Sequence, residues 1–478
     1  MMPDQERAIT SKHSDYMSYE DQWTKIRDVI EGQEAVKDKG QKYLPKLGGQ
    51  DGSQYDAYKK RALFFNMTGR TLDGYQGMIF RKPPTMEVPD ELEEIQDNIS
   101  LENETIKGFG KRLVRETIAT GRPGILVDFP RVDPESSTTE AEARRNGEFP
   151  YLTLYETEEI RNWYVDRENG DTKLKSLILH EDLENQEGYF GGDTMEQYRL
   201  LEINDEGIYV QHIWRRSVSD DDKDGWHKVE EVVPRMGGDP LEEIPFFFSG
   251  INNTTSRLPK PPLIDLANVN LSHYRSQADL EHGAHFTALP SITVTGADPD
   301  ELAITVGPES ANILENEDAS VEMLEYTGKG LEQLQDVINS KEEMMSDLGA
   351  RLVMNEENAQ DAEGTVRLKQ SGENSVIANI ADTAGMSYTE ALKFAARWIS
   401  GGSNEEPEVN VSFNKDLLPF PMDHNMLKAL MQMHQQNKIT WETLINNLKR
   451  GEIVEEGKSV EDIKSQLESE ATPNLGEL

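Results

Sequence analysis

Four acidic residues between positions 220 and 231 have the spacing of a calcium-binding loop. These residues are Asp220, Asp222, Asp224 and Glu231. With Gly225 they match the pattern D-x-D-x-D-G-x5-E, which in an EF-hand directs carboxylates at one hard cation. The flanking segments 213–214 and 229–233 are typical of strands rather than helices, and Lys228 stands where a ligand or a bridging water is expected. A hairpin turn explains the segment without calcium, so we favour a turn and keep calcium as the alternative.

A second group of potential metal ligands lies further along the chain. Glu281, His282 and His285 could share one face of a helix, but His273 lies elsewhere around that helix and no further ligand is evident. Solvent-facing helix residues are therefore the favoured interpretation. No Ser/His/Asp order and no carboxylate pair stands out among so many acids, so we assign no catalytic residue and expect no cofactor.

Composition excludes several classes of protein. The 478 residues suffice for about three domains. The chain has no cysteine, which excludes disulfides, thiolate metal sites and cysteine nucleophiles. No segment resembles a signal peptide or approaches the roughly 20 apolar residues of a membrane span, so we expect a soluble protein. The net charge of −40 argues against tight binding to phosphate backbones, because DNA binders gain affinity from basic contacts.

The first half of the chain predicts helices followed by a mostly antiparallel sheet. Helical spacing of apolar residues indicates helices near 18–31, 53–79 and 104–120. From Gly124 the apolar period changes to two. The predicted strands are 125–129, 151–155, 163–166, 174–180, 198–203, 208–214, 228–233 and 246–248. We expect a turn at 204–207 and a mobile loop at 132–148, and the fold class is α+β.

Two long helices with one apolar face each dominate the second half. The first apolar stripe consists of Leu263, Ala267, Leu271, Tyr274 and Ala278. The second stripe consists of Leu331, Leu334, Ile338, Met345, Leu348 and Leu352, with Lys341 interrupting it. At 1.5 Å per residue the second helix would span roughly 36 Å, so the pair would form a stalk. Packing of identical copies would cover both stripes, which predicts an oligomer.

The remaining elements surround this pair. Strands are expected between the two helices at 292–294, 303–306 and 321–324, and their open edges would pair with a neighbouring copy. A polar loop precedes a third helix at 377–398, in which Gly385 predicts a bend. A strand near 409–413 is expected to return to the N-terminal sheet. Two more helices follow around 426–433 and 441–450, and an acidic, frayed tail is expected beyond 454.

This order of elements resembles that of bacteriophage portal proteins, the head-to-tail connectors. Three stretches are similar to portal-like sequences of the uncharacterised-domain type: 59–84 (KKRALFFNMTGRTLDGYQGMIFRKPP), 121–128 (GRPGILVD) and 289–296 (LPSITVTG). The resemblance covers most of the chain. It implies a portal-like α+β fold, in which a mixed helix and antiparallel-sheet wing carries a long-helix stem, a small β-containing clip and a C-terminal helical crown.

The resemblance also assigns a part to each segment. The segments are the wing body 1–262, the first stem helix 263–289, the clip 290–329, the second stem helix 330–354, the tunnel loop 355–369, the bent wing helix with its returning strand 370–421, and the crown with its acidic tail 422–478. The tunnel-loop residues expected to line the channel are Asn355, Glu356, Glu357, Asn358, Gln360, Asp361, Glu363, Arg367 and Lys369. The acids would keep DNA from adhering, while Arg367 and Lys369 either contact phosphates transiently or pair with neighbouring acids.

The function implied by the resemblance is not enzymatic. About twelve copies would form a ring at the capsid vertex of a virion, assembled in the host cytoplasm, through which double-stranded DNA is packaged and ejected without sequence-specific binding. Terminase and a head-to-tail adaptor would dock on 291–326, and the major capsid or scaffolding protein would be a further partner. No membrane is involved. The ring would carry roughly −480 charges, which favours sliding of DNA over sticking, although acidity can also serve solubility alone.

Two other classes of protein stay open. One is an intracellular acidic hydrolase or a calcium-dependent enzyme that uses the acid-rich loops. The other is a structural adaptor or scaffold that assembles without conducting DNA. The form of the assembly would distinguish the three classes. Rings with a central hole indicate a portal, monomers indicate an enzyme, and closed or filamentous assemblies indicate a scaffold.

Overall fold

A computed structural model describes most of the chain in two compact units. The described residues are 9–130, 149–168, 170–184, 194–216, 225–287, 291–295, 320–324, 329–353, 376–402, 406–417, 424–451, 453–454 and 460–471. The units are 1–415 and 416–478, and each is treated by itself. Within the described ranges, no helix is both long enough and apolar enough to span a membrane.

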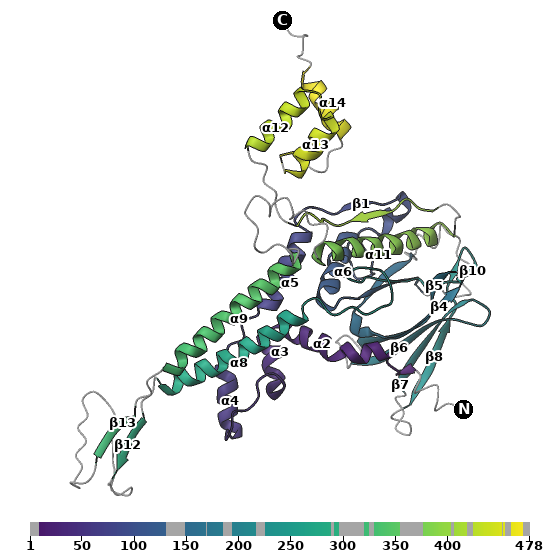
Figure 1. Cartoon of the computed structure of the whole chain (residues 1–478). Coiled ribbons are helices and arrows are strands. Elements are labelled where there is room, and N and C mark those ends of the chain that lie inside the picture. Colours follow the sequence, from purple (N-terminus) through teal and green to yellow (C-terminus); the bar gives the residue numbers. More distant parts are fainter. Residues whose placement is uncertain are drawn as a thin grey trace. The chain divides into compact units, whose positions relative to one another are not determined.

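Helices open the first unit (Figure 1). They are α2 Ser14–Glu31, α3 Gln33–Asp38, the 3-10 turn η1 Gly40–Lys42, α4 Gly52–Arg61, α5 Met67–Ile79, the 3-10 helix η2 Asp90–Ile95 and α6 Ile106–Thr120. The predicted end of α2 at Gly32 is confirmed, since this residue has a φ of 112°, which favours glycine. The helix starts earlier than predicted because the His13 side chain accepts a hydrogen bond from Asp15 N and acts as the N-cap.

The single helix predicted over 53–79 is wrong. The backbone leaves the helical region at Ala62, where φ is −54° and ψ is 127°. A new helix starts after Asn66, whose Oδ1 accepts from Gly69 N at 2.8 Å and whose Nδ2 donates to Ile30 O at 2.9 Å. Phe65, which precedes the new helix, is 38% exposed. The N-cap therefore overrides a continuous helical stripe.

Two antiparallel sheets follow, which confirms the α+β prediction. The strands of the three-stranded sheet are β2 Gly124–Asp128, β3 Tyr151–Tyr155 and β11 Phe246–Phe248, in the order β11-β2-β3. The strands of the five-stranded sheet are β4 Ile160–Glu168, β5 Asp171–Glu184, β6 Thr194–Ile203, β7 Tyr209–Arg216 and β8 Trp226–Val232, in chain order. The short 3-10 turn η3 Thr157–Glu159 and the pair β9 Arg235–Met236 and β10 Asp239–Pro240 complete this region. The loop predicted at 132–148 lies outside the described residues.

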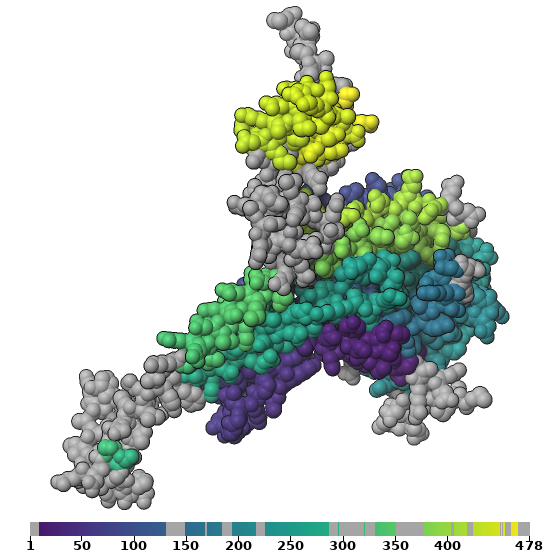
Figure 2. Space-filling model, viewed as in Figure 1, coloured from purple at the N-terminus to yellow at the C-terminus, as the bar shows by residue number. Residues whose placement is uncertain are grey.

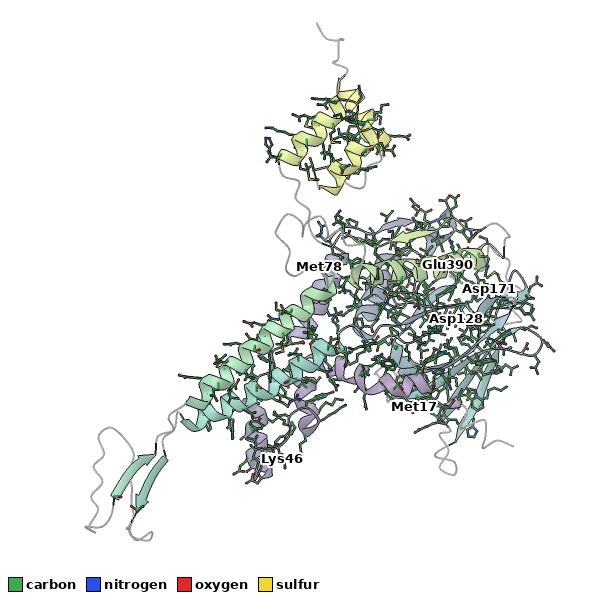
Figure 3. The ribbon with its side chains drawn as sticks, in the orientation of Figure 1. Met17, Lys46, Met78, Asp128, Asp171 and Glu390 are labelled. Carbon is green, nitrogen blue, oxygen red and sulfur yellow. The ribbon has the colours of Figure 1, made fainter. Side chains whose placement is uncertain are left out.

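A buried polar network joins the two sheets. Arg199 of β6 donates from Nη1 to Asp128 Oδ2 of β2 at 2.6 Å, and its Nε lies 2.9 Å from Glu181 Oε1 of β5. The Tyr155 hydroxyl of β3 donates to the same glutamate, and Gln211 Nε2 of β7 donates to Asp128 at 3.1 Å. Figure 3 labels Asp128 among the closely packed side chains of the body. Every charge in this network has a partner of opposite sign, as burial requires.

Two long helices extend from this body. They are α8 Ile264–Thr287 and α9 Lys329–Val353, and Figure 1 shows them side by side. Beyond their far ends, β12 Ser291–Thr295 pairs antiparallel with β13 Ser320–Leu324. The predicted helices and the strands at 292–294 and 321–324 are confirmed, whereas the strand predicted at 303–306 lies outside the described residues.

The third long helix, α11 Val376–Ile399, is confirmed as one continuous helix. Gly385 was predicted to permit a bend, but its position is explained by close packing: a Cβ there would lie 2.8 Å from Val411 O. The returning strand is β14 Asn410–Ser412. It pairs with β1 Thr85–Glu87 in a separate two-stranded sheet, so the prediction that it joins the N-terminal sheet is wrong.

The second unit contains three helices, α12 His424–Gln435, α13 Trp441–Arg450 and α14 Val460–Ala471. Thr440 is the N-cap of α13, since its Oγ1 accepts from Thr443 N at 3.1 Å. The prediction of a frayed tail beyond 454 is wrong for α14. Its apolar residues Val460, Ile463 and Leu467 recur at helical spacing within the acidic sequence.

Candidate functional site

The base of α8 is anchored to the first turn of α5 through one asparagine. Asn270 is fully buried. Its Oδ1 accepts from Met67 N at 3.1 Å, from Thr68 N at 3.1 Å and from Thr68 Oγ1 at 2.9 Å, and its Nδ2 donates to Phe65 O at 2.8 Å. The first N–H groups of a helix have no partner within that helix. Asn270 supplies those partners and so joins α8 to the N-terminal helices.

The apolar stripe of α8 is covered by the chain itself. Ile264, Ala267, Leu271, Tyr274 and Ala278 belong to one buried cluster with residues of α2, α3 and α4. Figure 2 shows the purple N-terminal helices against one side of the teal α8 and the green α9 against the other. The expectation that a second copy must cover this stripe is therefore wrong for α8. Apolar side chains of α2 to α4, far away in sequence, bury it instead.

Polar contacts also hold α8 further along its length. The Tyr58 hydroxyl of α4 donates to Asp279 Oδ1 at 2.6 Å, and Arg61 Nη2 lies 3.2 Å from His282 Nδ1. Burial and the neighbouring Arg61 charge lower the pKa of His282. Glu281 accepts a hydrogen bond from Gln277. Glu281 and His282 thus contact Gln277 and Arg61, and these contacts do not build the metal site considered at 281, 282 and 285.

The seam between α8 and α9 is apolar with one lysine in it. Ile338 and Met345 of α9 are each 1% exposed. Lys341 lies between them in sequence and donates from Nζ to Ser272 O at 3.0 Å and to Ser276 Oγ at 2.6 Å. Burial, followed by the nearby Arg275 charge, lowers the pKa of Lys341. The lysine that interrupts the predicted stripe thus faces α8 and contacts polar groups there.

The opposite face of α9 is acidic. The exposed acidic residues of this helix are Glu332, Asp336, Glu342, Glu343 and Asp347. Glu342 lies toward α8, where its Oε1 is 3.3 Å from His273 Nε2. At 100° per residue, the other four fall within one narrow arc opposite the seam. Two large apolar side chains lie beside this arc, Val337 at 45% and Met344 at 50% exposure. The pair α8 and α9 therefore presents a row of negative charge along one side.

Most of the predicted site residues lie outside the described part of the chain. This holds for all nine tunnel-loop residues, since the structure describes α9 to Val353 and α11 from Val376. It also holds for Asp220, Asp222 and Asp224 of the calcium-loop pattern. Glu231 lies on β8, where its carboxylate accepts from Lys228 Nζ at 2.6 Å and lies 3.4 Å from His212 Nδ1. The strand predicted on either side of that pattern is confirmed.

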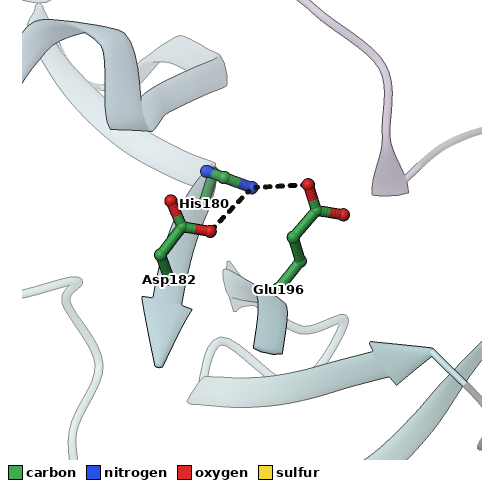
Figure 4. Close-up of side chains that lie close together, drawn as sticks. All are labelled: His180, Asp182 and Glu196. Carbon is green, nitrogen blue, oxygen red and sulfur yellow. Dashed lines mark ion pairs between the residues drawn. The ribbon is translucent and has the colours of Figure 1, made fainter. Parts of the chain in front are cut away.

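A cluster that was not predicted lies on the five-stranded sheet. The Nε2 atom of His180 is 3.9 Å from Asp182 Oδ1 and 4.0 Å from Glu196 Oε1 (Figure 4). Within the described ranges these residues form the one group whose ligand atoms could converge on a metal ion. The spacing His-x-Asp within a strand was the available sequence signal. The third residue could not be found without the register of β5 and β6.

Comparison with known proteins gives a partial family match and structural matches to a set of solved chains, two of which are described here. A domain of unknown function, DUF4055, matches residues 262–399, from the start of α8 to the end of α11. No curated protein matches the chain. A chain of the "Virion of native gene transfer agent (GTA) particle" is 9% identical, with 86% of this chain and 94% of that chain covered and a TM-score of 0.37. A chain of the "Neck of empty GTA particle computed with C6 symmetry" is 8% identical, with 82% and 90% covered and a TM-score of 0.37. At this TM-score neither match establishes the fold or the function of this chain.

Proposed function

We propose that this protein is a phage-type portal: a ring of about twelve copies at a capsid vertex, through which double-stranded DNA enters and leaves. In this proposal the ring is not an enzyme, and the terminase and a head-to-tail adaptor dock on 291–326. The loop 355–369 lines the narrowest part of the channel, and capsid or scaffolding protein surrounds the wing.

The observation that carries the proposal is the arrangement of α8, the β12–β13 hairpin, α9 and α11. Two antiparallel helices leave an α+β body, hold a small hairpin at their far ends and return to the body. At the return, the Tyr75 hydroxyl of α5 donates to Gly349 O of α9. Both helices are thus fixed to the body, Asn270 holding the first and Tyr75 the second. This is the arrangement expected of a stem that carries a clip, and the DUF4055 match spans the same segment.

The acidic row on α9 supports a channel wall. Glu332 and Asp336, and likewise Glu343 and Asp347, are like-charge pairs at spacing i, i+4, which weakens a helix by about 0.2–0.5 kcal/mol per pair. A helix that retains such pairs despite this cost meets a requirement other than its own stability, such as a function of its surface. Negative charge facing a duplex would repel phosphates and prevent adhesion. We therefore place this row toward the channel.

End-on negative-stain images and native mass measurement of the purified full chain test the proposal. We expect rings with a central hole and a mass close to that of twelve chains of 54.1 kDa. Stable monomers at high concentration, or closed and filamentous assemblies without a hole, would contradict the proposal.

A DNA-binding experiment tests the placement of the acidic row. We would replace Glu332, Asp336, Glu343 and Asp347 by their amides and measure retention of linear double-stranded DNA at low salt. The neutralised ring should retain DNA that the wild-type ring releases. The control replaces the exposed acids of η2, Asp90, Glu91, Glu93 and Glu94, with the same change in charge. Equal retention by both variants would show that the row does not face the DNA.

A further inference from the structure

The cluster of His180, Asp182 and Glu196 is built by strand register alone. His180 and Asp182 are two residues apart on β5, so their side chains share one face of the sheet. Asp182 is directly opposite Glu196 on β6. Their neighbours Glu181 and Gln197 point to the other face, where they join the buried network with Arg199. The three side chains therefore converge on the outer face of the sheet as a fixed consequence of the pairing.

The pairing of Asp182 with Glu196 is unfavourable by itself. Like charges directly opposite each other destabilise an antiparallel pair. Two cations lie nearby: Arg216 Nη2 is 3.8 Å from Glu196 Oε2, and the charge of Arg161 acts on His180. Burial, followed by the Arg161 charge, lowers the pKa of His180. Glu196 Oε1, the oxygen on the His180 side, is separate from the oxygen that faces Arg216.

The distances in the cluster are too long for hydrogen bonds and suit a shared ion. The His180 Nε2 atom lies 3.9 and 4.0 Å from the two carboxylates, beyond hydrogen-bond length. Zinc bonds to imidazole nitrogen and carboxylate oxygen are about 2.0–2.2 Å long, so two ligands of one tetrahedral zinc are about 3.4 Å apart. Both carboxylate side chains are about half exposed, 60% and 47%, and can close the difference by small rotations, whereas the imidazole is held at 12% exposure.

We propose that His180, Asp182 and Glu196 bind one divalent transition-metal ion of the zinc class on the outer face of the five-stranded sheet. The ion neutralises the opposed carboxylates and ties β5 to β6. Water fills its remaining coordination position. An imidazole ligand favours zinc, nickel or copper over calcium and magnesium, which prefer oxygen alone. The site is independent of the portal proposal, because it concerns a single chain.

Calorimetric titration of the untagged full chain with ZnCl₂, after removal of metals by a chelator, tests the site. We expect saturable binding of one zinc per chain and no comparable heat with calcium or magnesium. Cobalt as a second probe should give the visible absorption of a low-symmetry site. The variants His180→Gln and Glu196→Gln should each weaken zinc binding by about tenfold or more. Glu196 is partly exposed and its amide has the same shape, so this variant keeps the test valid if the histidine variant does not fold.

The matched control is His212→Gln. His212 lies on the same sheet with the same 12% side-chain exposure, but its two nitrogens face Glu202 and Glu231 on opposite sides of the ring, at 2.9 and 3.4 Å. Those carboxylates cannot meet at one ion, so this variant should bind zinc like the wild type. Absence of saturable zinc binding, wild-type affinity in the His180 and Glu196 variants, or equal binding of calcium would each overturn the proposal.

Discussion

Replacement of Asn270 by alanine should destabilise the first unit strongly. The side chain of Asn270 is fully buried and makes four hydrogen bonds, three to residues 67 and 68 and one to Phe65 O. The alanine variant would leave the first turn of α5 without these partners. It would also break the polar connection between α5 and α8, on which the position of the long helix depends.

The magnitude follows from the groups that lose their partner. Met67 N keeps a bond to Phe65 O at 2.8 Å, so it is not orphaned. Phe65 O keeps the same bond as its acceptor, whereas Thr68 N and the buried Thr68 hydroxyl both lose the Asn270 oxygen as acceptor. Each buried group left without a partner costs about 1–3 kcal/mol. We therefore expect the free energy of unfolding to fall by about 3–4 kcal/mol.

Urea unfolding followed by tryptophan fluorescence measures this change. Trp441 is the one tryptophan of the six in the second unit, so a Trp441→Phe background confines the signal to residues 1–415. The matched control is Asn268→Ala, two residues earlier on the same helix. Asn268 is exposed and accepts one bond from Lys25 Nζ at 2.8 Å, so its loss should cost less than about 0.5 kcal/mol.

Two results would refute this reasoning. The first is a change below about 1 kcal/mol in the Asn270 variant, which would mean that water or a rearranged backbone satisfies the α5 turn. The second is an equal change in both variants, which would mean that the amide acts through helix propensity and not through its contacts.

Three further predictions concern single side chains. Arg122 is fully buried between the rings of Trp163 and Phe248, and burial lowers the pKa of its guanidinium to about 9. Arg122→Met should leave the stability of the protein unchanged or raise it. Arg122→Lys should lower the stability by about 2 kcal/mol, because lysine keeps the charge and loses the stacking. Burial raises the pKa of Glu159 to about 8. The stability that the protonated carboxyl contributes is therefore complete below pH 4.5 and is lost as the pH rises through 8. Glu159→Gln should stabilise the protein more at pH 9 than at pH 5 in parallel urea titrations. Gly385→Ala should lower the free energy of unfolding by about 1–3 kcal/mol, because the new Cβ would meet Val411 O. Gly74→Ala in α5 has open space around it and should raise the free energy of unfolding by about 0.5–1 kcal/mol. Urea midpoints measure both changes.

Local sequence signals located most of the elements of this fold. Apolar spacing predicted α6, α8, α9 and α11, and alternation predicted the strands of both large sheets, because each pattern is contained within its own segment. The split between α4 and α5 was missed because Asn66 caps α5 through Gly69 N and is held by Ile30 O, a contact that the local stripe does not reveal. The strand β1 was missed because its three residues are too few to show a pattern and form a strand only by pairing with 410–412.

The candidate sites were harder to predict for the same reason. The calcium-loop pattern is local and stays a prediction, since three of its acids lie outside the described residues; its Glu231 contacts Lys228 and His212. The partner of His180 and Asp182 depends on which residue of β6 lies opposite them, which is a property of register. The sequence likewise showed one-sided helices but could not show that α2, α3 and α4 cover α8. Patterns within one segment could therefore be recognised in the sequence, whereas contacts between distant segments could not be predicted from it.

The lysine between α8 and α9 has a mechanical consequence. A shift of one helix along the other by a single residue, about 1.5 Å, would break the bonds from Lys341 Nζ to Ser272 O and Ser276 Oγ. Because Lys341 is only partly buried, water would replace part of these bonds, and their loss would cost about 1 kcal/mol. The two helices therefore resist shear. Force applied at the β12–β13 end should reach the body as a tilt of one rigid strut about its base.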